Sequence, residues 1–127
     1  MKDNSTFKNE LIKRSLSFGI SVIRFTNILP KERAYWIIAD QVIRSSTSIG
    51  ANIVEAQAAS SKKDFINFLL YALKSGNETK YWLMLIKGID QGLSGNIDSL
   101  YQEADELVKI LGSSVSKLKG RRKETNF

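Results

Sequence analysis

The stretch RSSTSIGANIVEAQAASSKKDF, from Arg44 to Phe65, decides how this chain folds. In its first half, apolar residues recur at steps of three and four, which is the spacing of one face of an α-helix. Its second half contains Ser61 with Asp64 three residues later, a pair typical of a helix N-terminus. The stretch therefore predicts the end of one helix, a short connection and the start of the next helix.

The same helical spacing extends in both directions, and no segment alternates apolar and polar residues as a strand would. Pro30 and the glycine-rich segment at residues 88–95 interrupt the pattern, because neither favours a continuous helix. Short connections between long helices favour antiparallel neighbours. The sequence thus predicts an all-α fold, an up-down-up-down four-helix bundle in a single domain at residues 1–127. Its expected helices span residues 6–29, 31–58, 62–89 and 97–118, followed by a basic tail at residues 119–127.

Gly50 lies inside the second expected helix. A glycine there costs about 1 kcal/mol relative to alanine, because it gains no side-chain contact and loses more backbone freedom. We therefore expect either a local bend or the close approach of another backbone at this position.

The composition excludes many kinds of chemistry. The 127 residues contain no cysteine and no histidine. This removes thiol catalysis, Ser-His-Asp triads and the usual zinc and iron–sulfur ligands. We found no nucleophile paired with an activating base. The sequence thus predicts a protein that is not an enzyme, with no catalytic, cofactor-binding or metal-binding residues.

The polar N-terminal stretch MKDNSTFKNE lacks the apolar run of a secretory signal. The longest apolar run, Phe68–Leu73, is far shorter than the ~20 residues that span a bilayer. We therefore expect a cytoplasmic protein with no membrane partner and no small-molecule substrate.

A line of polar residues follows one side of the second expected helix, at steps of three and four. Two interpretations are open: a solvated face, or a partly buried hydrogen-bonded seam inside the bundle or between subunits. The two charged members lie about 16 Å apart along the helix axis, so each needs a different partner. Glu78 is one candidate partner for the arginine, and a residue of a neighbouring copy is another. The polar seam comprises Gln41, Arg44, Ser48, Asn52 and Glu55, with Glu78 as its candidate partner on the third helix.

Together with ALKSGNETKYWL at Ala72–Leu83, the opening stretch resembles the four-helix proteins encoded in intervening sequences of bacterial 23S rRNA, often labelled the S23 ribosomal protein family. These proteins are similar in turn to the accessory variability proteins of diversity-generating retroelements. Where many members carry proline, this chain has Gly50. The matching positions are Arg44, Ser48-Ile49, Asn52-Ile53, Glu55-Ala56, Asp64-Phe65 and Ser75 to Glu78.

The resemblance implies a protomer that assembles with itself as a ring, as a homopentamer. The retroelement relatives bind a reverse transcriptase and its RNA template through a strongly basic surface. Two functions follow as hypotheses. The first is a homo-oligomeric scaffold that binds a protein or RNA partner. The alternative is a nucleic-acid-binding accessory protein that acts with a reverse transcriptase or on structured rRNA, so its partners would include RNA or DNA.

The net charge of +6 is concentrated at the two ends of the chain, since residues 1–33 and 117–127 each carry +4. Five cations near the C-terminus could contact phosphates, although a solubilising tail would look the same. The aromatic residues, including an adjacent Tyr35 and Trp36, favour core or subunit contacts over base stacking. The candidate nucleic-acid contacts are Lys117, Lys119, Arg121, Arg122 and Lys123.

Overall fold

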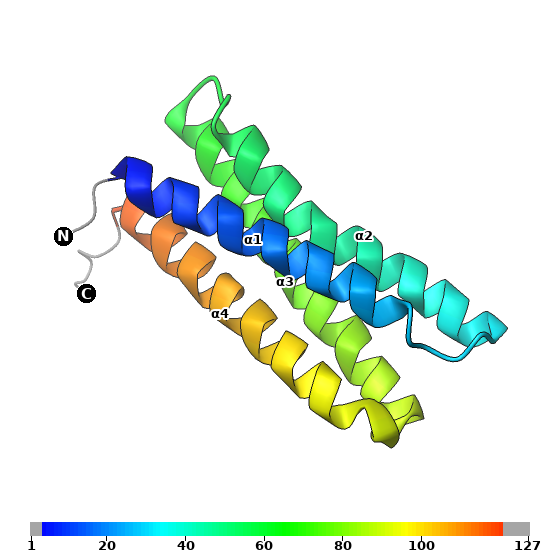
Figure 1. Cartoon of the computed structure of the whole chain (residues 1–127). Helices are drawn as coiled ribbons and strands as arrows, with labels where there is room; N and C mark the ends of the chain where they lie inside the picture. Colours follow the sequence, from blue (N-terminus) through cyan, green and yellow to red (C-terminus); the bar gives the residue numbers. More distant parts are fainter. Residues whose placement is uncertain (1–3, 121–127) are drawn as a thin grey trace.

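The computed structural model describes residues 4–120 and contains four long helices in this range (Figure 1). They are α1 (Asn4–Thr26), α2 (Arg33–Ala56), α3 (Lys62–Ile89) and α4 (Ser94–Leu118), with a short 3-10 helix, η1 (Gln91–Leu93), before α4. Successive helices run antiparallel, so the start of α1 and the end of α4 lie at the same end of the molecule (Figure 1). The predicted all-α bundle is confirmed.

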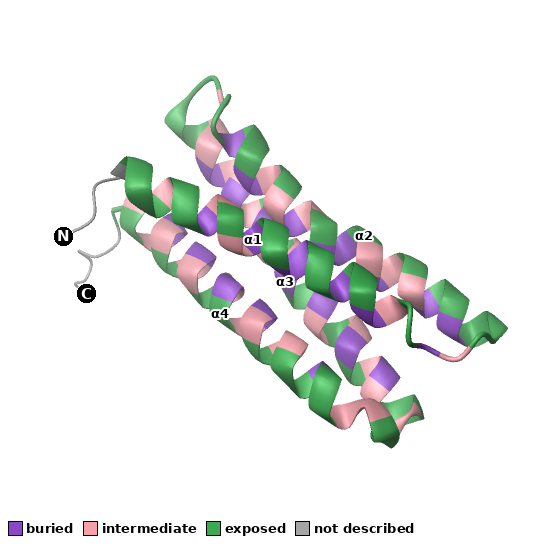
Figure 2. Cartoon of the chain, in the orientation of Figure 1, coloured by how far each residue is buried: buried purple, intermediate pink, exposed green. Residues whose placement is uncertain are grey.

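Helices α2 and α3 form the centre of the bundle. They pack against each other most extensively, while α1 packs mainly on α2 and α4 mainly on α3. Helices α1 and α4 touch at few places. The buried residues line the inner faces of all four helices (Figure 2). The core includes Phe18 and Val22 of α1, Val42, Ile49 and Ile53 of α2, Leu69, Leu83 and Ile86 of α3, and Ile97, Leu107 and Leu111 of α4.

The first connection is longer than the sequence predicted. Helix α1 ends at Thr26 rather than at residue 29, and α2 begins at Arg33 rather than at residue 31. The backbone N–H groups of the three residues after α1 donate hydrogen bonds to the carbonyl oxygens three residues earlier, as in a 3-10 turn. Glu32 then takes an extended conformation as the N-cap of α2. Pro30 consequently lies in the connection and not in the first turn of α2, because the extended residue after it precedes the helix.

The second connection follows the predicted pattern closely. The hydroxyl of Ser61 accepts a hydrogen bond from the backbone N–H of Asp64 at 3.0 Å, so α3 starts at Lys62 as expected. The carboxylate of Asp64 accepts from the backbone N–H of Ser60 at 3.1 Å, one residue earlier than a capping box would place it. Helix α2 ends at Ala56, two residues before the predicted end at residue 58.

The third connection is shorter than predicted. Asp90, with φ −137° and ψ 93°, ends α3, and its side chain accepts a hydrogen bond from the N–H of Gly92 at 3.1 Å. This local turn reverses the chain, so α4 begins at Ser94 instead of residue 97. Gly88 and Gly95 are accommodated within the helices, because a single exposed glycine costs a helix only about 1 kcal/mol.

Gly50 marks a close approach between helices. A Cβ atom at this position would lie 3.3 Å from Ser15 Cβ and 3.7 Å from the Ser15 carbonyl carbon. The backbone of α1 therefore passes directly over Gly50, and a larger residue would push the two helices apart. Of the two explanations that the sequence allowed for this glycine, the close approach is confirmed.

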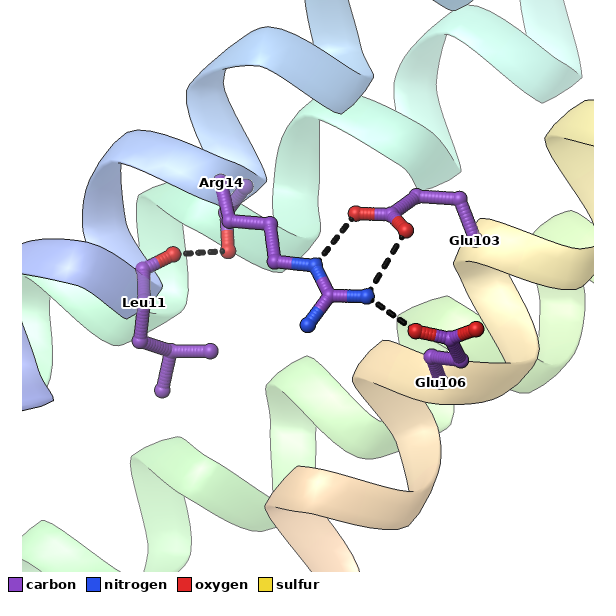
Figure 3. A network of polar contacts seen from close by, with 5 residues as sticks. Leu11, Arg14, Glu103 and Glu106 are labelled. Atoms are coloured by element: carbon purple, nitrogen blue, oxygen red, sulfur yellow. Dashed lines mark hydrogen bonds and ion pairs between the residues drawn. The ribbon is translucent and has the colours of Figure 1, made fainter.

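An ion cluster bridges the sparse contact between α1 and α4 (Figure 3). The Arg14 guanidinium donates to both carboxylate oxygens of Glu103, at 2.7 and 2.9 Å, and also to Glu106. The hydrogen bonds to Glu103, and then to Glu106, raise the pKa of Arg14 above its ordinary value. These two glutamates are therefore engaged in holding α1 against α4.

We expect Gly76→Ala to destabilise the protein. Its Cβ would lie 2.6 Å from Val108 Cγ2, so either the Val108 side chain or the two helices must shift, and such overpacking costs about 1–3 kcal/mol. Gly88→Ala is the matched control, because no atom lies within 4 Å of its added Cβ. The control should gain up to about 1 kcal/mol from helix propensity. Equilibrium urea unfolding measures both, and equal effects would contradict the tight α3–α4 contact.

We expect Asp105 to contribute to acid unfolding. Hydrogen bonds from Lys80 at 2.9 Å and Lys109 at 3.0 Å lower the pKa of this carboxyl group. A carboxyl group with a lowered folded-state pKa adds stability above its unfolded pKa of about 4, and loses it as the pH falls through the folded pKa. Asp105→Asn should reduce the change of the melting temperature with pH below about 4, measured by thermal unfolding at several pH values. Asp40→Asn is the control, because Asp40 is exposed and no ion pair engages it within residues 4–120.

Candidate functional site

The polar seam lies on the side of α2 that faces α3. Gln41, Ser48 and Asn52 are half-buried there, whereas Arg44 and Glu55 are exposed on its outer edge. This division follows from the helical positions, because the two charged residues point farther from α3 than the amides and the hydroxyl do. The seam therefore has an inner hydrogen-bonded part and an outer charged part.

Three side chains join the inner part of the seam across the two helices. The Asn52 amide donates to both the carbonyl and the hydroxyl oxygen of Ser48, each at 2.9 Å. The Ser75 hydroxyl of α3 donates to the Ser48 hydroxyl at 3.0 Å. Ser48, Asn52 and Ser75 thus each have a partner within the protomer, which fixes their orientation.

A second polar contact, between Ser45 of α2 and Thr79 of α3, lies deeper and was not predicted from the sequence. Both residues are buried, and Thr79 Oγ1 lies 2.8 Å from Ser45 Oγ and 2.8 Å from the Ser75 carbonyl oxygen. One hydroxyl proton serves one bond, so the arrangement is satisfied when Ser45 donates to Thr79 and Thr79 donates to Ser75. The sequence did contain one sign of this contact: Ser75 and Thr79 are four residues apart, so they lie on the same face of the helix.

The outer charges have no partner within the described protomer. No ion pair or hydrogen bond engages the side chain of Arg44 or of Glu55 in residues 4–120. Glu78, the candidate partner of Arg44 on α3, accepts a hydrogen bond from Trp82 Nε1 at 3.0 Å instead. The Arg44–Glu78 pair is therefore not formed within the protomer, and pairing with a neighbouring copy stays a prediction.

Two exposed aromatic rings lie on α3, the helix that the seam faces. Tyr71 is 50% exposed and packs edge-on against Phe68, with ring centroids 6.0 Å apart. Tyr81 is 59% exposed and packs edge-on against Trp82 at 5.1 Å. On α2, Trp36 is 60% exposed whereas the adjacent Tyr35 is buried in the core. Successive helical residues point about 100° apart, which separates the two rings.

An apolar groove between α1 and α2 escaped the sequence reasoning. Leu16, Ile20 and Val54 are exposed along it, and Gly19 and Gly50 form part of its floor. Ile23 also lines the groove and is 41% exposed, although it shares the helical spacing of the apolar residues of α1. The apolar face of α1 is wide enough to line both the core and this groove, so the sequence pattern did not distinguish the two.

The candidate nucleic-acid contacts are only partly described. Lys117 and Lys119 are exposed at the end of α4. Arg121, Arg122 and Lys123 lie outside the described residues. Two exposed lysines at the start of α3, Lys62 and Lys63, line the same hollow as Lys119.

The helices do not have the character of membrane spans. Within residues 4–120, none combines the length and the apolar content that crossing a bilayer would require. In the same range, no group of three acidic side chains is placed to hold a metal ion.

Comparisons with known proteins agree with this architecture. No curated protein is significantly similar to the chain in sequence. Among solved structures, the chain is similar to a protein of unknown function from the S23 ribosomal protein family of Bacteroides thetaiotaomicron VPI-5482, solved by crystallography. The two share 37% sequence identity with a TM-score of 0.77, and the match covers 83% of this chain and 97% of the other.

A family assignment follows from the sequence match and from the shared fold. Residues 8–113 match the family described as 23S rRNA-intervening sequence protein. This range contains the polar seam, its partners on α3 and most of each of the four helices. The chain therefore belongs to the family of 23S rRNA-intervening sequence proteins.

Proposed function

We propose that this protein is a non-enzymatic scaffold that assembles with copies of itself and binds a protein or RNA partner. The observation that carries the proposal is the outer edge of the seam. Arg44 and Glu55 are exposed without a partner in the described protomer, next to hydrogen-bonded Ser48, Asn52 and Ser75. Opposite charges beside fixed polar groups and exposed aromatic rings form a surface suited to a specific contact.

A ring of copies needs two different surfaces on each protomer, because a head-to-tail contact joins one surface to another. The protein presents two surfaces of different character. One is the polar seam, and the other is the apolar groove between α1 and α2, which meets the seam at Glu55. We infer that the assembly is a ring, and the family resemblance favours a pentamer.

A second candidate function is a nucleic-acid-binding accessory protein that acts with a reverse transcriptase or on structured rRNA. It is favoured by the exposed lysines at the end of α4 and at the start of α3. Filter binding of RNA at several salt concentrations tests it, because phosphate contacts make the affinity fall with salt. Absence of binding at low salt would contradict this function.

We expect Arg44→Ala and Glu55→Ala to weaken assembly without unfolding the protomer. Each side chain is exposed in the protomer, so its loss should change the free energy of unfolding by less than about 0.5 kcal/mol. Removing one member of a charge pair buried in an interface costs about 2–5 kcal/mol of association. Size-exclusion chromatography coupled to light scattering measures the assembly, and urea unfolding of the dissociated protomer measures stability.

Lys109→Ala serves as the control, because Lys109 is an exposed cation on α4 whose ion pair lies within one helix. The control should keep the wild-type mass. A monomeric wild-type protein at micromolar concentration, or seam variants with unchanged mass, would refute the assembly proposed here.

A further inference from the structure

Five lysines gather at the end of the bundle where α1 begins and α4 ends. They come from three helices, and no ion pair engages any of them within residues 4–120. The acids of α4 lie farther along the helix and are held by other cations, including Arg14, Lys80 and Lys87. The five lysines, here called the basic end, are Lys8 of α1, Lys62 and Lys63 of α3, and Lys117 and Lys119 around the end of α4.

Three acids lie near these lysines in the sequence or at this end of the bundle: Glu10, two residues after Lys8, Asp64 beside Lys63, and Glu55 near the end of α2. The Asp64 carboxylate accepts hydrogen bonds from the backbone N–H and the hydroxyl of Ser60 and forms no ion pair with a lysine within residues 4–120. Five cations outnumber these three acids, so the basic end keeps an excess of positive charge that attracts a polyanion.

An apolar pocket of about 500 Å³ opens within the basic end, and all four helices contribute to it. Its walls include Phe7, which is 42% exposed, and the half-buried Phe65. Lys8 and Lys117 also line this pocket. The volume falls within the range of small-molecule sites, which is about 300–1,000 Å³.

A second hollow adjoins the pocket and extends the positive charge. Lys62, Lys63 and Lys119 line it, and Leu118 borders both hollows. A ligand with a single anionic head would use one or two of these cations. Five cations spread over two adjoining hollows suit a ligand whose negative charges repeat along a chain.

We propose that the basic end binds a single-stranded nucleic acid, with phosphates along the lysines and one base against Phe7 in the pocket. Single-strand sites combine a cationic track with aromatic rings on which bases stack, and both features are present here. The amide side chains of Gln57 and Asn67 line the two hollows and add hydrogen-bonding capacity. The inference rests on the second candidate function and does not depend on ring assembly.

The test is fluorescence anisotropy of a labelled 20-nucleotide single strand with the full chain at several salt concentrations. Five phosphate contacts should give a slope of log affinity against log salt of about −3.5, since each single-strand contact contributes about −0.7. The double variant Lys62→Ala/Lys63→Ala should make the slope shallower by about 1.4. The control Lys31→Ala/Lys74→Ala removes two exposed lysines outside both hollows and should leave the slope unchanged.

Phe7→Leu separates stacking from charge, because it keeps an apolar side chain at an exposed position. It should weaken binding by about 5-fold or more at fixed salt while the slope stays the same. If Phe7→Leu changed the salt dependence but left the affinity at fixed salt unaltered, the proposed base contact in the pocket would be overturned. Light scattering on every sample records whether assembly has altered.

Further outcomes distinguish the site from the function. Binding lost on substituting Arg121, Arg122 and Lys123 but kept in the Lys62→Ala/Lys63→Ala variant would overturn this site while leaving nucleic-acid binding intact. No binding by the wild-type protein at low salt would overturn both. Preference for a duplex of equal length, or for vesicles of anionic lipid, over the single strand would also overturn the inference.

Discussion

The bundle depends on the small side chains of α2, which let neighbouring helices approach its backbone closely. Gly50 lies under the backbone of α1 near Ser15, and Ser45 meets Thr79 of α3 in the buried interior. Close packing of backbones strengthens dispersion contacts, but it also buries hydroxyl groups that need partners. The hydrogen bonds between α2 and α3 supply those partners, so tight packing and polar satisfaction are achieved by the same residues.

This solution explains why the seam has two parts. Groups that face α3 bond within the protomer, whereas Arg44 and Glu55 point outward at the edge of the same surface. The inner bonds fix the backbone and the side chains beneath the outer charges. A surface prepared in this way loses little side-chain entropy when it meets a partner, which favours specific association.

The paired acids of α4 and the unpaired lysines lie at different places along the bundle. The acids of α4 bind Arg14, Lys80 and Lys87 and hold α4 against its neighbours. Lys117 and Lys119, at the end of α4, form no ion pair within the described residues. Charges that stabilise the fold are therefore separated from charges that are available to a partner.

Helical periodicity in the sequence was sufficient to predict four helices and to place five polar residues on one side of the second, and Ser61 with Asp64 predicted the cap that begins the third. These features depend on residues close together in the chain, where spacing and local hydrogen bonds fix the conformation. Gly50 predicted either a local bend or a close backbone approach, and the pattern did not reveal which helix lies over it. The helix ends near Pro30 and Asp90 were predicted less well, because local turn geometry outweighed residue preference there.

The exposure of Ile23 and the buried Ser45–Thr79 contact required the packed bundle. Each depends on which helix lies beside which face, and on how far apart residues remote in sequence come to rest. Periodicity shows that a face is apolar or polar, but it does not show which of two neighbouring helices covers it. The same reason hid the apolar groove of α1 and the gathering of lysines from three helices at one end.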